Sequence, residues 1–198
     1  MENTLIIFIK NPILGKVKSR LALTIGKENA LGIYLDLLEK TRRETRKVNA
    51  KRMLYYSTYI DNNDEWNQRY FFKHLQKGKD LGERMRNAFE EALQYKTIII
   101  GSDCYEISSA IIEEAFLALD KFDIVIGPAN DGGYYLLGTK SFYPSLFENI
   151  DWSTERVLQQ TLDCAYRQNL SIAFLKELVD LDTFSDIEKS SYKYKQNY

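Results

Sequence analysis

Short runs of apolar and tyrosine residues recur along the chain, separated by turns or by longer amphipathic stretches. A short apolar run between polar residues is typical of a strand buried on both faces of a parallel sheet. On this basis we predict strands over residues 4–9, 53–59, 71–75, 97–101, 123–127, 134–138 and 171–178.

The stretches between these strands carry apolar residues at helical spacing. Asp80 followed by Glu83 has the spacing of a capping box, so a helix should begin at Asp80. The other predicted helices span residues 27–48, 108–119 and 153–168, the last opened by a serine cap, with a short helix after Thr183. The polar residues from about 190 are expected to fray.

Strands that alternate with helices predict an α/β fold, a three-layer α/β/α sandwich around a mainly parallel (mixed) central sheet. The 198 residues are 44% hydrophobic and no Pro/Gly-rich linker divides them, so we expect a single domain over residues 1–198. Ligands bind such sheets at the carboxyl ends of the strands. The informative loops are therefore those that follow residues 9, 101 and 127.

Composition narrows the function classes. The 27 Lys and Arg residues balance 28 Asp and Glu, so no global field attracts nucleic acid or an anionic membrane. The apolar runs are too short for a membrane span, and we expect a cytoplasmic protein. Cys104 and Cys164 suit neither a disulfide framework nor a zinc knuckle, and the lone His74 excludes a multi-histidine metal site.

The loop after the first predicted strand concentrates positive charge. In "KNPILGKVKSRL", Lys10, Lys16, Lys18 and Arg20 fall within eleven residues, with Gly15 at the bend. Lysines act as point charges on phosphates, and a glycine lets backbone amides approach an oxyanion. The spacing differs from a P-loop. Both a phosphate site and a solvated basic loop are compatible with this pattern.

Carboxylates follow three later strands. In "GSDC", Asp103 suits Mg²⁺ or Mn²⁺, or else caps a turn. In "GPANDGGYYLLG", Asp131 precedes Gly132 and Gly133, which indicates either a loop that closely fits a ligand or an Asp-Gly hairpin turn. In "DLDTFSDI", Asp182 comes just before a capped helix, as a metal ligand or as a turn residue.

Six segments in order, "KNPILGKVKSRL", "GKDLGERM", "GSDC", "GPANDGGYYLLG", "DWST" and "DLDTFSDI", closely resemble those of the DUF2064 family. The similarity runs from about residue 5 to residue 188. Members are nucleotide-diphospho-sugar transferases with a GT-A-like fold, also described as glycosyltransferases of radical-SAM or arsenosugar gene neighbourhoods. The chain departs from the family pattern at Tyr105, where members generally have proline.

The resemblance implies a nucleotide pocket at the first loop. It also implies a role for each matching residue. The basic residues would lie near phosphates, Asp103 would bind the metal and Asp182 would complete its site. The remaining matches are Asp80 and Arg84, which would contact the nucleotide or cap a helix, and Asp131, Gly132 and Gly133 in the acceptor-side loop.

The leading hypothesis is Mg²⁺- or Mn²⁺-dependent glycosyl transfer from a nucleotide diphospho-sugar to a small acceptor, with Asp131 as the base. One alternative is a nucleotidylyltransferase that joins a nucleoside triphosphate to its partner and releases pyrophosphate. Another is a nucleotide-binding module without catalysis, suggested by Tyr105. Nucleoside diphosphate and pyrophosphate as products distinguish the two enzymes.

Overall fold

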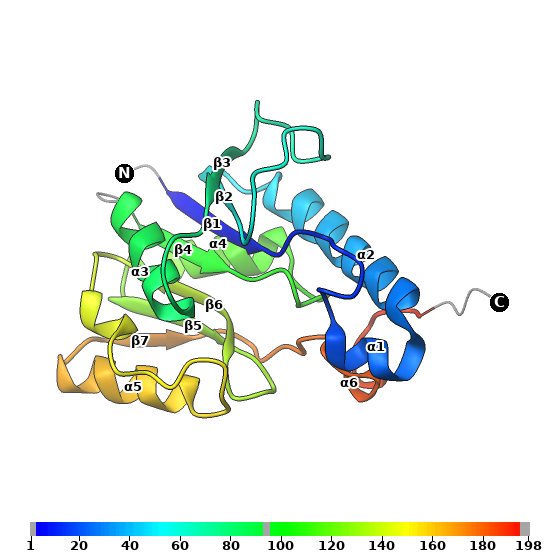
Figure 1. Cartoon of the computed structure of the whole chain (residues 1–198). Helices are drawn as coiled ribbons and strands as arrows, with labels where there is room; N and C mark the ends of the chain where they lie inside the picture. The colour runs from blue at the N-terminus through cyan, green and yellow to red at the C-terminus, as the bar shows by residue number, and fades with distance from the viewer. Residues whose placement is uncertain (1–2, 93–95, 195–198) are drawn as a thin grey trace.

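One mixed sheet lies between two layers of helices in the computed structural model, which describes residues 3–92 and 96–194 (Figure 1). The strand order is β3-β2-β1-β4-β6-β5-β7, and β6 runs antiparallel to both of its neighbours. The strands are β1 (Thr4–Ile9), β2 (Lys51–Tyr56), β3 (Phe72–Leu75), β4 (Thr97–Ile100), β5 (Ile124–Pro128), β6 (Tyr134–Thr139) and β7 (Ile172–Phe174).

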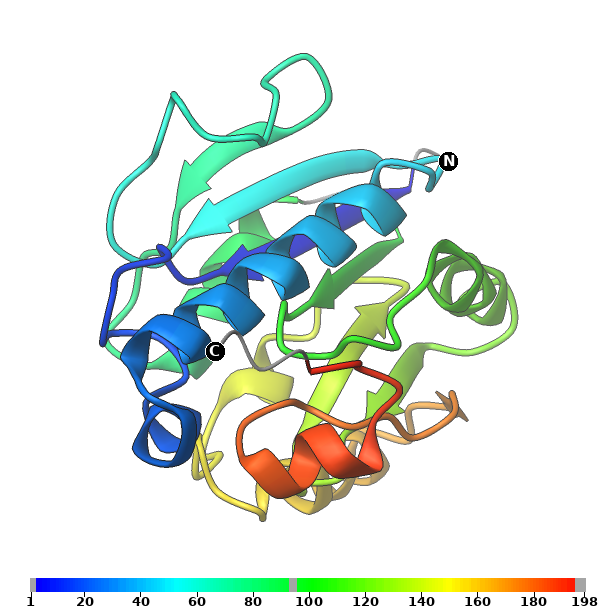
Figure 2. The ribbon, with the colours of Figure 1, turned by 90° about the vertical axis from the view of Figure 1, so that its right-hand side faces the viewer.

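The helices divide between the two faces of this sheet. They are α1 (Ser19–Ile25), α2 (Lys27–Thr45), α3 (Leu81–Glu91), α4 (Ser109–Ala118), the 3-10 helix η1 (Pro144–Phe147), α5 (Val157–Arg167) and α6 (Phe184–Lys189). Buried residues of α1, α2, α4 and α6 share one core cluster, whereas those of α3, η1 and α5 share the other. Figure 2 views the face that α2 and α6 cover. The predicted α/β/α sandwich is confirmed.

Alternation along the strands explains how one sheet supports two cores. In β1, Leu5, Ile7 and Ile9 belong to the cluster under α2, while Ile6 and Phe8 belong to the cluster under α3. Successive side chains of a strand point to opposite faces. The unbroken apolar run of β1 therefore reflects burial on both faces, as the sequence predicts.

Every predicted strand overlaps an observed one, and the differences lie at the ends. Strand β7 stops at Phe174, earlier than the predicted residue 178. Beyond it, an isolated bridge joins Ala129 and Leu178, so the chain stays beside β5 without a regular ladder. The helix α1 lies directly after the basic loop, where no helix was predicted.

The predicted serine cap of α5 is wrong. The helix begins at Val157 with Arg156 as its N-cap and no side-chain cap, and Ser153 has a φ of 65°. Thr154 forms the preceding turn, because its hydroxyl donates to the Asp151 carbonyl at 2.7 Å. The predicted caps of α3 and α6 are confirmed, because Asp80 and Thr183 each accept a backbone hydrogen bond from the first turn, and Ser108 caps α4 in the same way.

Two of the six quoted segments meet through a close packing contact. A Cβ on Gly82, in "GKDLGERM", would lie 2.1 Å from Nε1 of Trp152, in "DWST". The indole therefore lies directly on the α3 backbone, which only glycine permits. These residues hold α3 against the segment before α5.

The C-terminal segment packs against α2 and the loop after β4. Ser191 donates from its backbone amide and its hydroxyl to Glu106 at 2.6 and 2.9 Å, and Tyr192 donates to Asp36 at 2.5 Å. The Tyr192 ring meets Tyr105 edge-on, with ring centroids 5.0 Å apart. Residues 190–194 of the expected frayed tail thus make specific contacts, while residues 195–198 lie outside the described part. Among the described helices, none combines the length and apolarity needed to cross a bilayer.

The carboxylate of Glu44 joins the end of α2 to the start of α4. It accepts hydrogen bonds from Lys47 at 3.0 Å and from the Ser109 backbone amide at 3.4 Å. Burial opposes ionisation, but Lys47, Ser109 and Lys40 outweigh it and lower the pKa of Glu44 from 4.5 to about 2. The ionised carboxylate therefore stabilises the folded state.

We predict that Glu44→Gln lowers the free energy of unfolding at pH 7 by about 1–2 kcal/mol. Because the folded pKa is depressed, the contribution is complete above pH 4.5 and is lost as the pH falls toward 2. Urea unfolding of both proteins between pH 2 and 7 measures this. A stability difference that stays constant over the whole range would contradict it.

Candidate functional site

The first crossing of the sheet places two loops side by side. The chain leaves β1 for β2 and β3 on one side, then returns to pair β4 on the other side of β1. The loops after β1 and β4 therefore start next to each other at the carboxyl edge. Such a switch point is where open α/β sheets bind ligands.

Lys18 connects these loops. Its residue is the N-cap of α1, with φ of 48°, and its side chain is only 3% exposed. The ammonium contacts Asp103 Oδ1 and donates to Asp182 Oδ1 at 3.1 Å. Burial opposes its charge, but the two aspartates outweigh it and raise the pKa of Lys18. The lysine stays protonated.

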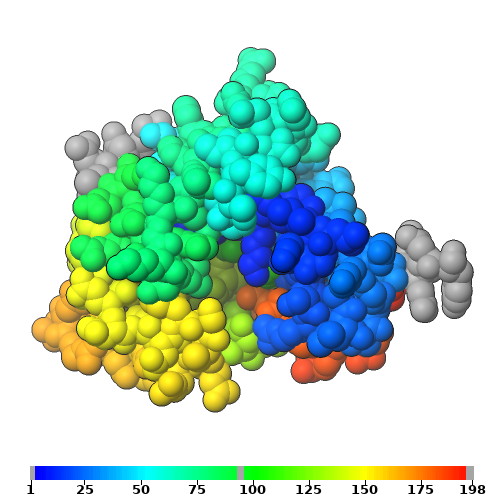
Figure 3. Space-filling model, in the orientation of Figure 1, coloured from blue at the N-terminus to red at the C-terminus, as the bar shows by residue number. Residues whose placement is uncertain are grey.

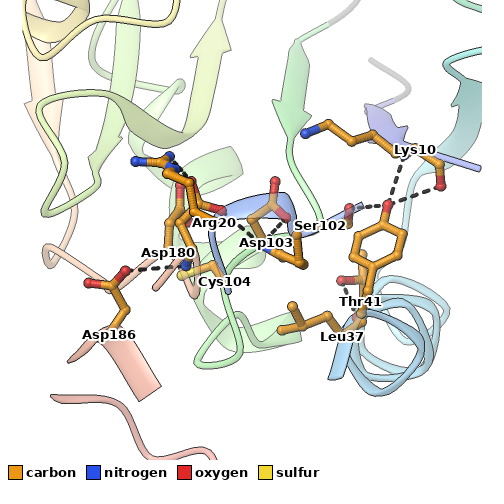
Figure 4. A network of polar contacts seen from close by, with 12 residues as sticks. Lys10, Arg20, Leu37, Thr41, Ser102, Asp103, Cys104, Asp180 and Asp186 are labelled. Carbon is orange, nitrogen blue, oxygen red and sulfur yellow. Dashed lines mark hydrogen bonds and ion pairs between the residues drawn. The ribbon is translucent and has the colours of Figure 1, made fainter. Parts of the chain in front are cut away.

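Arg20 completes the ion-pair group from the first turn of α1. Its guanidinium contacts Asp182 Oδ2, so both oxygens of Asp182 face cations. Burial opposes ionisation of Asp182, but Lys18, Arg20 and Lys10 outweigh it and lower its pKa. Four predicted site residues, Lys18, Arg20, Asp103 and Asp182, are thus together, and Figure 4 shows Arg20 and Asp103 among them.

A tyrosine that was not among the predicted site residues joins the strand ends under this group. Tyr34 of α2 is 1% exposed, and its hydroxyl accepts from the Lys10 amide at 2.8 Å. It also donates to the Lys10 carbonyl and lies 3.2 Å from the Ser102 hydroxyl. One buried hydroxyl therefore ties β1 to the loop that carries Asp103. Its position in an amphipathic helix gives only the signal of a core residue.

Asn11 and Gln76 fix the neighbouring loops in the same way. The buried Asn11 amide donates to the Tyr59 carbonyl at 2.9 Å and accepts from the Thr58 amide at 3.0 Å. Gln76 donates to the carbonyls of Ile9 and Tyr55 at 3.1 Å. The loops that follow β1, β2 and β3 are thus held at one edge.

Asp180 is a further residue that the sequence predictions omitted. Its burial and the nearby carboxylates of Asp103 and Asp131 raise its pKa from 3.8 to about 8. Asp180 lies beside the loop that carries Asp103, because an isolated antiparallel β-bridge pairs it with Cys104. A strongly shifted carboxyl in such a place is characteristic of functional sites. Sequence cannot reveal the shift, because burial and neighbouring charges cause it.

Asp131 lies in the hairpin between β5 and β6. Its Oδ1 accepts from the Gly133 amide at 2.9 Å, and Gly132 has φ of 86°. Asp131 therefore shapes its own turn, and its charge also acts on Asp180. The expected hairpin turn is observed, whereas a close fit of this loop to a ligand stays a prediction.

The other predicted residues stand apart from the ion-pair group. Asp80 caps α3, and Arg84 donates to the Gly78 carbonyl at 3.2 Å. Gly15 has φ of 73° and forms a bend against Lys27. Lys10 and Lys16 are exposed, and Lys10 is near enough to lower the pKa of Asp182.

A hollow marks this edge on the surface. Figure 3 shows it between the blue N-terminal residues, the green and yellow residues and the orange segment near residue 180. A separate hollow of about 490 Å³ lies between α2 and residues 192–194. It is lined by Tyr105 and contains none of the predicted site residues. Tyr105 therefore packs toward α2, under Lys40, and away from the ion-pair group.

The donor set around Asp103 decides what metal could bind. Within residues 3–92 and 96–194, no three His, Cys, Asp or Glu side chains form a group suited to hold a metal ion. The Asp103 side chain is 32% exposed, and Mg²⁺ commonly binds one or two carboxylates together with substrate phosphates. Asp103 thus fits an ion that shares its coordination with a diphosphate.

Comparisons with known proteins identify the family of the chain and structures with a similar fold. The family model "Uncharacterized protein conserved in bacteria (DUF2064)" matches residues 41–154. A "putative nucleotide-diphospho-sugar transferase" from Desulfovibrio desulfuricans G20 is 29% identical, with a TM-score of 0.85 over 96% of this chain and 92% of that chain. None of the curated proteins matches the sequence.

Two more distant structures share the fold alone. The inositol-1-phosphate CTP transferase from T. maritima is 12% identical, with a TM-score of 0.62 over 93% of this chain and 91% of that one. The manganese complex of Rv0371C from Mycobacterium tuberculosis H37Rv is 10% identical, with a TM-score of 0.56 over 96% and 97%. The fold thus occurs both in nucleotide-sugar transferases and in nucleotidyltransferases.

Gly132 generates a prediction about the hairpin. A Cβ there would lie 2.2 Å from the Glu155 carbonyl oxygen, and the positive φ adds strain. We expect Gly132→Ala to cost about 2–3 kcal/mol of unfolding free energy. The matched control is Gly32→Ala, since Gly32 lies in a helix with open space around its Cα. Equal thermal stability of Gly132→Ala and wild type would contradict the close contact.

Proposed function

Because the chain belongs to the DUF2064 family, we propose that it is a transferase that uses a nucleotide diphospho-sugar and passes the glycosyl group to a small acceptor. The similarity to the Desulfovibrio protein supports the donor class. The convergence of Lys18, Arg20, Asp103 and Asp182 at the switch point is the observation that carries the proposal.

The charges at this edge suit a diphosphate. Lys18 and Arg20 are paired with aspartates, whereas Lys10 and Lys16 are exposed and free to reach an anion. We assign the donor phosphates to Lys10 and Lys16, on the side of Asp103. Cations that reach the phosphates stabilise the charge that develops on a leaving group.

Asp103, whose side chain is 32% exposed, is the residue that would hold a divalent ion with the phosphates. When bound, Mg²⁺ or Mn²⁺ would neutralise the charge on the departing nucleoside diphosphate. Asp182 would hold Lys18 and Arg20 in place beside it. The manganese complex of a structural neighbour supports this cofactor class.

Asp131 is the proposed base for the acceptor. Its exposed carboxylate has one oxygen on the Gly133 amide, which fixes its direction, and it lies near the other acidic residues. A base at the rim can take the proton of an acceptor hydroxyl as the new bond forms. Gly132 and Gly133 let the acceptor approach the backbone closely.

Nucleotidyl transfer is the second candidate, favoured by the fold of the T. maritima CTP transferase. A departing pyrophosphate needs more positive charge than a sugar donor does. Two of the four loop cations are already paired with aspartates, which weakens this candidate. The non-catalytic alternative loses its main support, because Tyr105 packs toward α2.

Nucleotide binding is tested first by thermal unfolding with nucleotide sugars, with and without Mg²⁺ or Mn²⁺. At about a hundredfold excess over Kd, the matching donor should raise Tm by roughly 5–10 °C. Asp103→Asn should lose the part of this shift that depends on metal. Asp163→Asn, an exposed carboxylate on α5, is the control and should keep it. If no nucleotide raises Tm with either ion, the proposal fails.

The base assignment is tested by turnover. We expect Asp131→Asn to lower kcat by about 10²–10⁴-fold with little change in donor affinity, because only proton transfer is lost. Product analysis in the same assay should find nucleoside diphosphate. Full turnover by the variant would show that Asp131 is not the base. Release of pyrophosphate would contradict glycosyl transfer and support nucleotidyl transfer instead.

A further inference from the structure

The position of Lys18 raises a question about the metal that the proposed function includes. Its ammonium is buried between Asp103 Oδ1 and Asp182 Oδ1, the two carboxylates that the sequence predicts as metal ligands. A divalent ion bridging these carboxylates would need the same space. One cation, supplied by the chain, already fills it.

The chain holds this lysine in place firmly. Lys18 has a left-handed backbone, with φ of 48° and ψ of 44°, which is uncommon for a non-glycine residue and directs the chain into α1. Its side chain is 3% exposed, and a buried ammonium is stable only when it is paired. Moving it to admit a metal would leave a buried charge without its partners.

Neighbouring charges reinforce the exclusion. Arg20 contacts the other oxygen of Asp182, and Lys10 is close enough to act on Asp182. The two aspartates thus face two paired cations and one nearby cation. A bare divalent ion entering this group would be repelled by all three.

We propose that Lys18 takes the place of a protein-bound divalent ion between Asp103 and Asp182, so that the chain without nucleotide has no divalent-ion site there. The metal then binds together with the donor diphosphate, on the exposed side of Asp103. This last step rests on the proposed function, whereas the exclusion of the bare ion stands on the ion pairs themselves. Nucleotide and metal would therefore bind in a coupled way, with each strengthening the other.

The test measures the binding of Mn²⁺ to the nucleotide-free protein. Calorimetry and the electron paramagnetic resonance signal of free Mn²⁺ are the two readouts. Wild type should show no site with a Kd below about 1 mM. Lys18→Met removes the ammonium and keeps the aliphatic part of the side chain. This variant should gain an Mn²⁺ site that is at least about tenfold tighter than the wild-type limit, because a close positive charge is lost. Asp182→Asn in the Lys18→Met background should remove the gained site.

Two matched variants separate this effect from general charge. Lys16→Met removes a cation from the same loop outside the ion pairs and should leave Mn²⁺ binding as in wild type. Lys18→Arg keeps the charge and should also gain no site. Equal gains in Lys16→Met and Lys18→Met would overturn the proposal, since net charge alone would then explain them.

The wild-type measurement decides the question even if Lys18→Met does not fold. Mn²⁺ binding to nucleotide-free wild type with a Kd well below 1 mM, abolished by Asp103→Asn, would overturn the proposal. The proposed function fails separately, when nucleotide sugars do not bind with or without Mn²⁺. Wild type that binds Mn²⁺ only when a nucleotide sugar is present supports both.

Discussion

The buried ammonium of Lys18 is the interaction on which the carboxyl edge of the sheet depends. It joins the start of α1 to the loop after β4 and to the segment before α6. Lys18 and Asp182 are 164 residues apart in the sequence. A buried charge that loses a partner is strongly destabilising, so the three segments are constrained together. The capping box of α6 and the hydroxyl of Tyr34 then fix the same segments from outside the group.

This constraint divides the basic loop into two functional parts. Lys18 and Arg20 serve the protein itself by neutralising Asp103 and Asp182, while Lys10 and Lys16 face solvent at the edge. A loop with four free cations would suit a triphosphate and its departing pyrophosphate. A loop with two suits the diphosphate donor that we propose.

The fold could be predicted from the sequence because burial on both faces leaves a plain pattern. The run at β1 and the capping residues of α3 and α6 carry local signals that tertiary contacts reinforce. The edge of the sheet that carries the candidate site could also be predicted, because the carboxyl ends of parallel strands lie together. The prediction that Ser153 caps α5 was wrong because Thr154 forms the turn that precedes this helix.

The site could be predicted only in part, since pairing between distant side chains leaves no local pattern. Sequence placed Lys18 among phosphate-binding cations, but which lysine would be buried between two aspartates depends on the path of α1. Asp180 acquires its shifted pKa from burial and from carboxylates on other loops. Tyr34 has the spacing of an ordinary core residue, and only the strand ends above it make it a connector.

The most direct measurement is a double-mutant cycle between Lys18→Met and Asp182→Asn, followed by urea unfolding at neutral pH. If the buried ion pair holds the edge together, each single change should cost about 3–5 kcal/mol. The double variant should then cost less than the sum by more than about 1 kcal/mol. Effects that add to within about 0.5 kcal/mol would contradict the account, because the two side chains would then act independently.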